Sequence, residues 1–154
     1  MRRDRELKPR IDPSQVLRRP ATPWDREFLE EAHVAALGPV ALVADGWTAE
    51  RLRAQFQREV SVDNCWVISA EGMRAGYISV EDKRGHWYID AFAILPKYQG
   101  RGVGEAALRN VQAEAAVIRL SVFLTNRASR LYERVGFRVI SVERGRQLME
   151  WRAS

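Results

Sequence analysis

The chain has few of the residues that form disulfides and metal centres: one cysteine, Cys65, and two histidines among 154 residues. A single thiol cannot form an internal disulfide, which favours a reducing compartment, and we expect a cytoplasmic protein. The cysteine and the two histidines lie far apart in the sequence and form no recognisable metal-binding set, so we expect no metal. His33 and His86 are expected at the surface or in capping positions.

Long apolar runs and linkers are also missing. No stretch approaches the roughly 20 apolar residues that span a bilayer, and no apolar segment follows the charged start Met1–Glu6 as it would in a secretory signal. No repeat or low-complexity segment divides the chain. With 46% hydrophobic residues, the sequence predicts a basic flexible tail over residues 1–13 and one folded domain over residues 14–154.

The net charge of +5 does not by itself indicate a nucleic-acid partner. Binding to a phosphate backbone usually needs basic residues gathered on one face. Here arginines are spread along the chain between acidic residues, and the densest basic stretch is Arg2–Arg10. Nucleic acid is therefore an unlikely partner by composition, whereas a small ligand that carries several phosphates suits the charge.

The first third of the chain has mainly helical spacing. Its predicted elements are, in order, a strand at Val16–Pro20, a helix from Thr22 to about Leu37 ended by Gly38-Pro39, a loop over residues 38–47, and a helix capped by Thr48 with Leu52, Phe56 and Val60 as its buried stripe.

From Cys65 onward the spacing is that of strands separated by turns. The predicted elements are three antiparallel strands at residues 66–69, 75–80 and 87–95, a helix from about Gly102 to Ala116, a strand at 117–124, a short helix from Asn126 to Gly136, and a hairpin of residues 137–142 and 147–151. The strand–helix–strand order predicts that the strands at 87–95 and 117–124 are parallel neighbours.

The most informative segment is Pro96–Glu105, where a strand ends, three alternating glycines follow and a helix begins. The first turn of a helix leaves backbone N–H groups without partners and carries a partial positive charge. Glycines at positions 100, 102 and 104 remove the side chains that would block a ligand, and Arg101 adds a full charge. This pattern predicts a cradle for a diphosphate.

Three alternatives to that interpretation can be compared on sequence. A P-loop needs a lysine and a hydroxyl after its last glycine, but Glu105 and Ala106 stand there. A dinucleotide-binding loop has the spacing Gly-x-Gly-x-x-Gly and follows the first strand of its unit. Here the glycines alternate and the loop follows the fourth predicted strand. A glycine-rich turn without a ligand does not account for the flanking Gln99 and Arg101.

The motif Gln99-x-x-Gly102-x-Gly104 is similar to the pyrophosphate-binding motif of the GNAT N-acetyltransferases. The resemblance extends to Phe92–Pro96, to Asn126–Phe137 with its ending Leu-Tyr-Glu-x-x-Gly-Phe, and to Arg18–Asp25. It covers about residues 15–152. It implies an α/β fold (α+β mixed): a mostly antiparallel sheet of six or seven strands, with strands four and five parallel and splayed, and about four flanking helices.

The resemblance further implies acetyl-CoA as co-substrate, held between the splayed strands. The cofactor-binding residues it implies are Ala93, Ile94, Leu95, Gln99, Gly100, Arg101, Gly102, Val103, Gly104, Glu105, Asn126, Leu131 and Tyr132. It also implies direct attack of an amine on the thioester in a ternary complex, with a backbone N–H near Ile94 as the donor to the oxyanion.

Tyr132 aligns with the family's usual general acid. A phenol can protonate a leaving thiolate, although Tyr132 also fits the role of a core aromatic beside Leu131 and Phe137. No base stands out: Asp90 and Glu81 are the remaining candidates, and the alternative is that each is a solvated carboxylate at the edge of the sheet. The ribosomal-protein alanine acetyltransferases carry a glutamate on strand five, whereas this chain has Leu-Ser-Val at residues 120–122.

The acceptor is expected between residues 37–50 and 144–148, which the family resemblance places around the second substrate. Asp45 and Trp47 would suit a cationic amine, unless Trp47 packs against the second helix; Arg144 and Arg146 would suit an acidic acceptor. Small amines, amino acids, antibiotics and protein N-termini all remain open. A non-catalytic module that binds coenzyme A is the alternative function, and a homodimer is possible.

Overall fold

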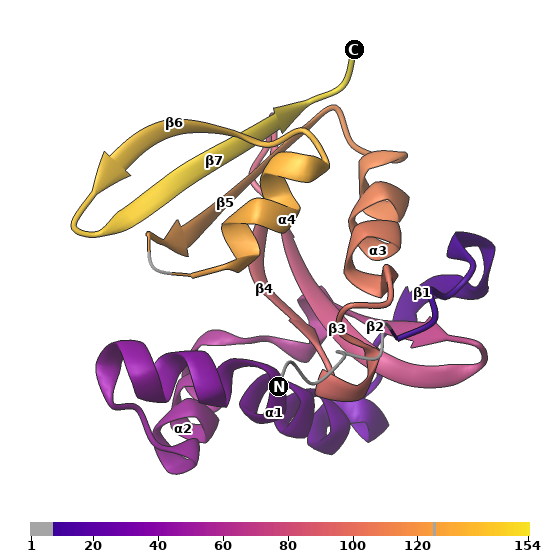
Figure 1. Cartoon of the computed structure of the whole chain (residues 1–154), viewed down its shortest axis with the longest axis vertical. Helices are drawn as coiled ribbons and strands as arrows, with labels where there is room; N and C mark the ends of the chain where they lie inside the picture. Colours follow the sequence, from indigo (N-terminus) through magenta and orange to yellow (C-terminus); the bar gives the residue numbers. More distant parts are fainter. Residues whose placement is uncertain (1–7, 125) are drawn as a thin grey trace, which may run out of the picture.

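A computed structural model describes residues 8–124 and 126–154, and in this part of the chain seven strands form one sheet in the order β1-β2-β3-β4-β5-β7-β6 (Figure 1). The strands are β1 (Val16–Pro20), β2 (Cys65–Ala70), β3 (Met73–Asp82), β4 (Trp87–Ile94), β5 (Val117–Phe123), β6 (Arg138–Glu143) and β7 (Arg146–Arg152). Only β4 and β5 pair in parallel; the other neighbours are antiparallel. This confirms the predicted fold class.

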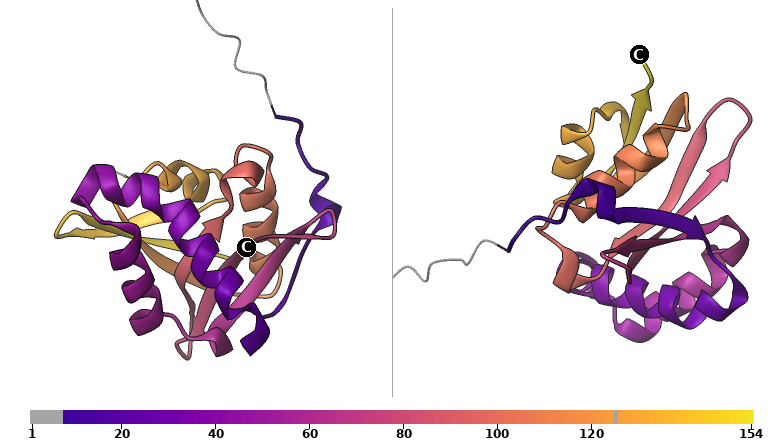
Figure 2. Two further views of the ribbon diagram at one scale, coloured as in Figure 1. Left: turned by 90° about the horizontal axis from the view of Figure 1, so that it is seen from below. Right: turned by 90° about the vertical axis from the view of Figure 1, so that its right-hand side faces the viewer.

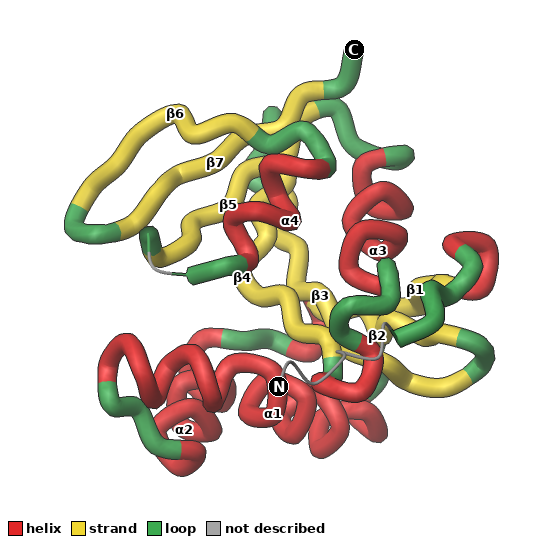
Figure 3. The backbone as a smooth tube through the Cα atoms, in the orientation of Figure 1, coloured by secondary structure: helices red, strands yellow, loops and turns green. Residues whose placement is uncertain are grey.

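Four α-helices in the described residues cover the two faces of the sheet: α1 (Arg26–Asp45), α2 (Ala49–Glu59), α3 (Val103–Gln112) and α4 (Ala128–Arg134). Figures 2 and 3 show α1 and α2 together on one side of the sheet and α3 with α4 on the other. Each side has its own buried cluster, one containing Leu29 and Phe56, the other Leu108 and Val111. None of the described helices has the length and apolar character to cross a membrane.

The sheet opens between its two parallel strands. Pairing of β4 with β5 is limited to Trp87–Ile89 against Ile118–Leu120. Beyond these residues β4 continues along β3 and β5 continues along β7, so the two strands diverge. Asp90 follows Ile89, the last β4 residue that pairs with β5, and therefore lies where the two strands diverge. It is also the extra residue of a β-bulge, because the β3–β4 register passes from Val80–Ile89 to Ser79–Ala91.

Helix α1 differs from its prediction. It passes through Gly38 and Pro39 and ends at Asp45, so both the predicted stop after Leu37 and the loop over residues 38–47 are wrong. A proline inside a helix removes one hydrogen bond and crowds the preceding turn. Packing against α2 compensates: Leu52 Cδ1 lies 3.9 Å from where a Gly38 Cβ would be. Gly38 thus lies inside the helix, and its Cβ position is within ordinary contact distance of Leu52 on α2.

The other boundaries agree more closely. Thr48 caps α2, accepting a hydrogen bond of 3.2 Å from the Arg51 N–H as predicted. Helix α3 ends at Gln112, four residues before the predicted end. Of the predicted flexible tail, residues 1–7 lie outside the described residues. Residues 8–13 do not form a free tail, because Ile11 is buried in the core and its N–H donates to the Arg101 carbonyl at 2.9 Å.

His33 is buried, which corrects the expected surface position. Its Nδ1 lies 2.7 Å from the Tyr77 hydroxyl on β3, and its Nε2 lies 3.4 Å from Gln55 Oε1 on α2. Burial lowers the pKa of His33. The imidazole therefore links both helices of this layer to the sheet as a neutral group.

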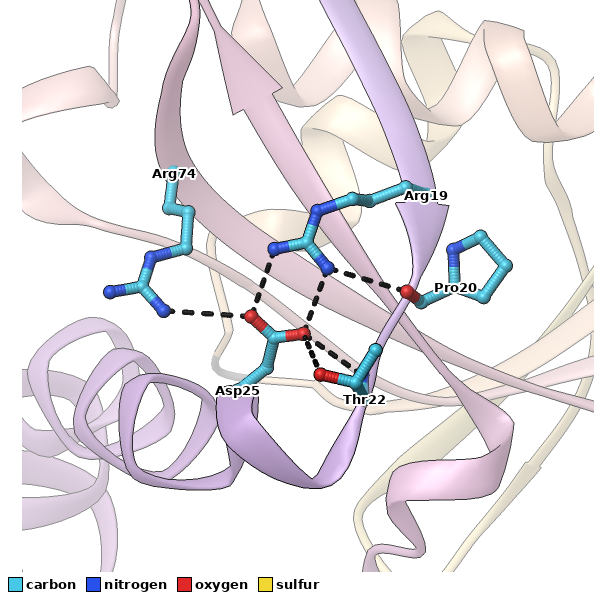
Figure 4. A network of polar contacts seen from close by, with 5 residues as sticks. All are labelled: Arg19, Pro20, Thr22, Asp25 and Arg74. Carbon is cyan, nitrogen blue, oxygen red and sulfur yellow. Dashed lines mark hydrogen bonds and ion pairs between the residues drawn. The ribbon is translucent and has the colours of Figure 1, made fainter.

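A buried carboxylate fixes the start of α1 against β1 and β3 (Figure 4). Asp25 accepts two hydrogen bonds from the Arg19 guanidinium, at 2.8 and 2.9 Å, and one of 2.9 Å from the Thr22 N–H. Arg74 of β3 lies 3.5 Å away on the other side. The bonds from Arg19 hold the pKa of Asp25 well below its usual range.

Replacing Asp25→Asn is expected to lower the free energy of unfolding by about 2 kcal/mol, since bonds to a charged group and a helix cap are both weakened. The pKa of Asp25 is depressed in the folded state, so its contribution is present above about pH 4 and is lost as the pH falls below that. Urea denaturation at pH 7 and pH 3 measures both effects. Asp63→Asn changes an exposed aspartate and serves as the control. Equal urea midpoints for Asp25→Asn and Asp63→Asn would contradict the stabilising role of Asp25.

Candidate active site

The glycine-rich loop connects the end of β4 to the start of α3. The short 3-10 helix Pro96–Tyr98 turns the chain, and Gly100 and Gly102 then adopt left-handed conformations with φ of 72° and 83°. Gly102 is the N-cap residue of α3 and carries no side chain that could cap it. The N–H groups of the first helical turn are therefore open to a ligand from outside the helix.

Gln99 has a structural role in this loop. Its side-chain Nε2 donates a hydrogen bond of 2.9 Å to the Ile94 carbonyl, the last residue of β4. The bond ties the loop to the strand and fixes the distance between the open strand edge and the glycines. Gln99 thus positions the cradle through Ile94.

A cavity of about 520 Å³ lies beside the diverging strands. Its size is within the range of small-molecule binding sites. Ten of the predicted cofactor residues line it: Ala93, Ile94, Gln99, Gly100, Gly102, Gly104, Glu105, Asn126, Leu131 and Tyr132. Segments from β4 and the adjoining glycine loop therefore meet α4, which comes later in the chain, at one place.

Three predicted cofactor residues lie away from the cavity. Val103 is fully buried in the core beneath α3, and Leu95 packs against both core clusters. Arg101 turns toward the N-terminal segment, where its Nε donates 3.0 Å to the Pro9 carbonyl. For Arg101 and Val103 the prediction concerns backbone N–H groups, so the directions of their side chains leave it open.

Several lining residues were not predicted as ligands from the sequence: Arg10, Ala36, Leu37, Phe92, Arg127, Ala128 and Arg134. Phe92 belongs to the motif strand, and Ala36 and Leu37 belong to the apolar stripe of α1, so periodicity offered a signal for these three. No sequence pattern indicated Arg10, because it reaches the site through a contact between segments about 90 residues apart.

Tyr132 is buried on α4 between two aromatic rings. Its ring centroid lies 6.4 Å from that of Phe92 and 5.8 Å from that of Phe137. The hydroxyl is protonated at neutral pH, and burial raises the pKa of the phenol, which makes it a weaker acid than an exposed tyrosine. It lines the cavity and can donate this proton to a group bound there.

Asn126 starts the helix that carries Tyr132. Its side-chain Oδ1 accepts a hydrogen bond of 2.9 Å from the Ala128 N–H. The carbonyl end of the side chain is thus used to begin α4, which leaves the amide nitrogen as the group that can face a ligand.

Neither predicted base lines the cavity. Asp90 and Glu81 lie on adjacent strands, Asp90 at the bulge where β4 leaves β5. Partial burial raises the pKa of Asp90, and the negative charge of Glu81 raises it further, while Lys83 acts in the opposite direction. Glu81 forms an ion pair of 3.2 Å with Lys83. The two carboxylates form a small acidic group beside the divergence point.

The predicted acceptor residues are only partly described. The side chain of Asp45 lies outside the described residues, although its backbone forms the end of α1. Trp47 is half-buried, and the Arg51 guanidinium lies 4.2 Å from its ring centroid, so it packs on the start of α2. Arg146 lies over Phe123 at 4.3 Å, and its Nε donates 3.0 Å to the Ser121 hydroxyl.

Comparison with known proteins places this arrangement in a family. The family model for an acetyltransferase (GNAT) domain matches residues 61–139, about half of the chain. An amino-acid acetyltransferase of Ralstonia nicotianae is 29% identical over 82% of the chain. The chain spans only about a third of that relative's length, 31%.

Solved structures share the fold at low identity. The PaiA N-acetyltransferase of Thermoplasma acidophilum, in complex with coenzyme A, has a TM-score of 0.66 at 16% identity, over 90% of this chain and 99% of its own. The ribosomal-protein-S18-alanine N-acetyltransferase of Escherichia coli has 0.67 at 18%, over 90% and 94%. A GNAT-family acetyltransferase of Streptococcus agalactiae has 0.76 at 16%, over 90% and 96%.

The matched residues include β4, the glycine loop, the start of α3 and α4, which supply most of the residues that line the cavity. Together with the splayed parallel strands and the open first turn of α3, this match shows that the chain belongs to the GNAT acetyltransferase family.

Proposed function

We propose that this protein is an N-acetyltransferase that transfers the acetyl group of acetyl-CoA directly to a primary amine of a small molecule or peptide in a ternary complex. The observation that carries the proposal is a single cavity lined by the glycines at the start of α3, the free edge of β4 and the phenol of Tyr132. An anion cradle, an unpaired strand edge and a proton donor are the three groups that such a transfer needs.

The residues at the cradle fit a diphosphate. A Cβ on Gly104 would lie 3.0 Å from Leu131 Cδ2, and one on Gly102 would lie 2.8 Å from Arg10 Nη2. Glycine at these positions lets the loop lie close to Leu131 and the Arg10 guanidinium, and the first turn of α3 keeps its N–H groups without a side-chain cap. Acetyl-CoA, when bound, supplies an acetyl group activated as a thioester; the chain itself supplies the cradle, the strand edge and a proton.

The edge of β4 offers main-chain groups to the rest of the ligand. From Ala91 to Ile94 this edge faces the opening where β5 has turned away. Backbone groups without a partner are favourable ligands for amides, and an N–H here can stabilise negative charge on a carbonyl oxygen. Tyr132, on the neighbouring wall, is proposed to protonate the leaving sulfur.

On the acceptor side, Asp90 is proposed as the group that receives a proton from the amine, directly or through water. Its place at the bulge brings it close to the point where β4 becomes free. The raised pKa of Asp90 is the direction that makes a carboxylate a better base. A carboxylate pair at this position also favours a cationic acceptor over an acidic one.

Replacing Tyr132→Phe is expected to lower kcat by about 10²–10⁴-fold, because the proton donor is lost, while the affinity for acetyl-CoA changes little. Thiol release with a panel of amines measures kcat. Tyr98→Phe removes the hydroxyl of another buried tyrosine and is the control. An unchanged kcat in Tyr132→Phe would make this residue a core aromatic only. A wild-type protein that binds acetyl-CoA but acetylates no amine would be a binding module.

The pH dependence of kcat/KM tests Asp90. A base works when deprotonated, so activity should fall as the pH falls through the raised pKa of Asp90. Glu81→Gln removes a negative charge near Asp90 and is expected to move this fall in activity, the acid limb of the profile, to lower pH. Asp90→Asn should abolish the acid limb. Glu71→Gln, in the β2–β3 turn, serves as control. A limb that stays in place in both Glu81→Gln and Asp90→Asn argues that another group is the base.

Replacing Gly102→Ala is expected to weaken the binding of coenzyme A at least tenfold, measured by calorimetry. Gly145→Ala is a matched control, because Gly145 also has a left-handed φ, 75° against 83°, but lies in the β6–β7 turn with nothing near its Cβ position. Both variants should lose about 1–2 kcal/mol of stability through backbone strain. Equal affinity of the two variants would show that the ligand does not use the cradle.

A further inference from the structure

The segment Lys8–Asp12, called the N-terminal strap below, lies against the glycine loop. The strap is held by a buried side chain and by hydrogen bonds to the glycine loop. The Ile11 side chain is 3% exposed within the core cluster, and its N–H donates to the Arg101 carbonyl at 2.9 Å. In return, Arg101 Nε donates 3.0 Å to the Pro9 carbonyl. The backbone on both sides of Arg10 is therefore fixed to the loop.

This anchoring places the Arg10 guanidinium directly over the cradle. Its Nη2 and Cζ lie 2.8 and 3.1 Å from the position of a Cβ on Gly102. Arg10 lines the cavity, yet its side chain is 67% exposed. Its head group is thus accessible to a ligand, whereas its backbone is not free to leave.

Among the described residues, the contacts of the Arg10 side chain are weak. Its Nη2 makes one bond of 3.3 Å to Glu105 Oε2, in the first turn of α3. Arg109 donates 3.2 Å to the other oxygen of the same carboxylate. Glu105 would therefore keep a cationic partner if Arg10 turned to another anion, and an exposed ion pair of this kind contributes little stability.

We propose that Arg10 is a ligand of the coenzyme A diphosphate, supplied to the cradle from outside the glycine motif by the N-terminal strap. This inference rests on the proposed function. A guanidinium forms paired hydrogen bonds with phosphate oxygens and stays charged at all relevant pH values. The N–H groups in the first turn of α3 and the Arg10 guanidinium beside Gly102 would hold the diphosphate together.

The same geometry also fits the opposite role, in which the Arg10 side chain blocks the cradle like a plug. A cation that occupies the cradle can compete with the ligand for space and hold Glu105 in place. The two roles predict opposite signs: removing a ligand weakens coenzyme A binding, and removing a plug strengthens it. A difference of sign is a sharper test than a loss of activity.

The test is calorimetric titration of the full chain with coenzyme A, comparing wild type, Arg10→Gln and Arg109→Gln. Both variants remove one positive charge and one bond to Glu105, but only Arg10 lines the cavity. We expect Arg10→Gln to raise Kd about tenfold, as for a lost hydrogen bond to a charged group, and Arg109→Gln to raise it less than about twofold. The difference in Kd between the two variants should become smaller at high salt, because Arg10 is exposed and salt screens its charge.

Two further measurements assign the phosphate. Arg10→Lys keeps the charge without the planar fork and should recover only part of the affinity. Titration with dephospho-coenzyme A, which lacks the 3′-phosphate, should leave the effect of Arg10→Gln unchanged. If that effect disappears with dephospho-coenzyme A, Arg10 binds the 3′-phosphate and the diphosphate assignment is overturned.

Equal affinities of wild type and Arg10→Gln, or tighter binding by Arg10→Gln, would overturn the inference while leaving the proposed function intact. A wild-type protein that does not bind coenzyme A would instead contradict the proposed function itself. Circular dichroism of each variant confirms folding, which the exposed position of Arg10 should leave unaffected.

Discussion

The divergence of β4 from β5 is the constraint on which the rest of the site depends. Two parallel strands that pair over only three residues leave backbone groups that no other strand satisfies. Unpaired main-chain groups are unfavourable in a protein interior unless a ligand or water pairs with them. The unpaired Asp90 at the bulge marks where the strands part, and the glycine loop, α3 and α4 surround the resulting opening.

Each wall of this opening is held by a contact that has no direct chemical role. Gln99 ties the glycine loop to the last carbonyl of β4, Asn126 begins the helix that carries Tyr132, and Ile11 fixes the N-terminal strap in the core. Groups that bind or react are thereby mounted on elements whose positions are set by neighbouring packing. Precise placement of this kind is what a transfer between two bound molecules requires.

Short-range patterns predicted much of this chain because the physics they report is local. The glycines at 100 and 102 need left-handed backbone, Thr48 caps its helix, and the strand–helix–strand order makes β4 and β5 parallel. The end of α1 was mispredicted because α1 packs against α2, and this tertiary contact is not visible in the local signal of Gly38-Pro39. His33 was misplaced for the same reason, since its partners lie on β3 and α2.

The sequence by itself determined the uncapped helix start after alternating glycines, which is encoded in ten consecutive residues, and the parallel pairing of β4 with β5. The place of β7 between β5 and β6 came from the structure. Only the tertiary structure decided which side chains reach the cavity. Arg10 enters it and Arg101 leaves it, although the motif favours Arg101. The reason is that side-chain direction at a loop depends on what packs against it, here a segment about 90 residues away in the chain.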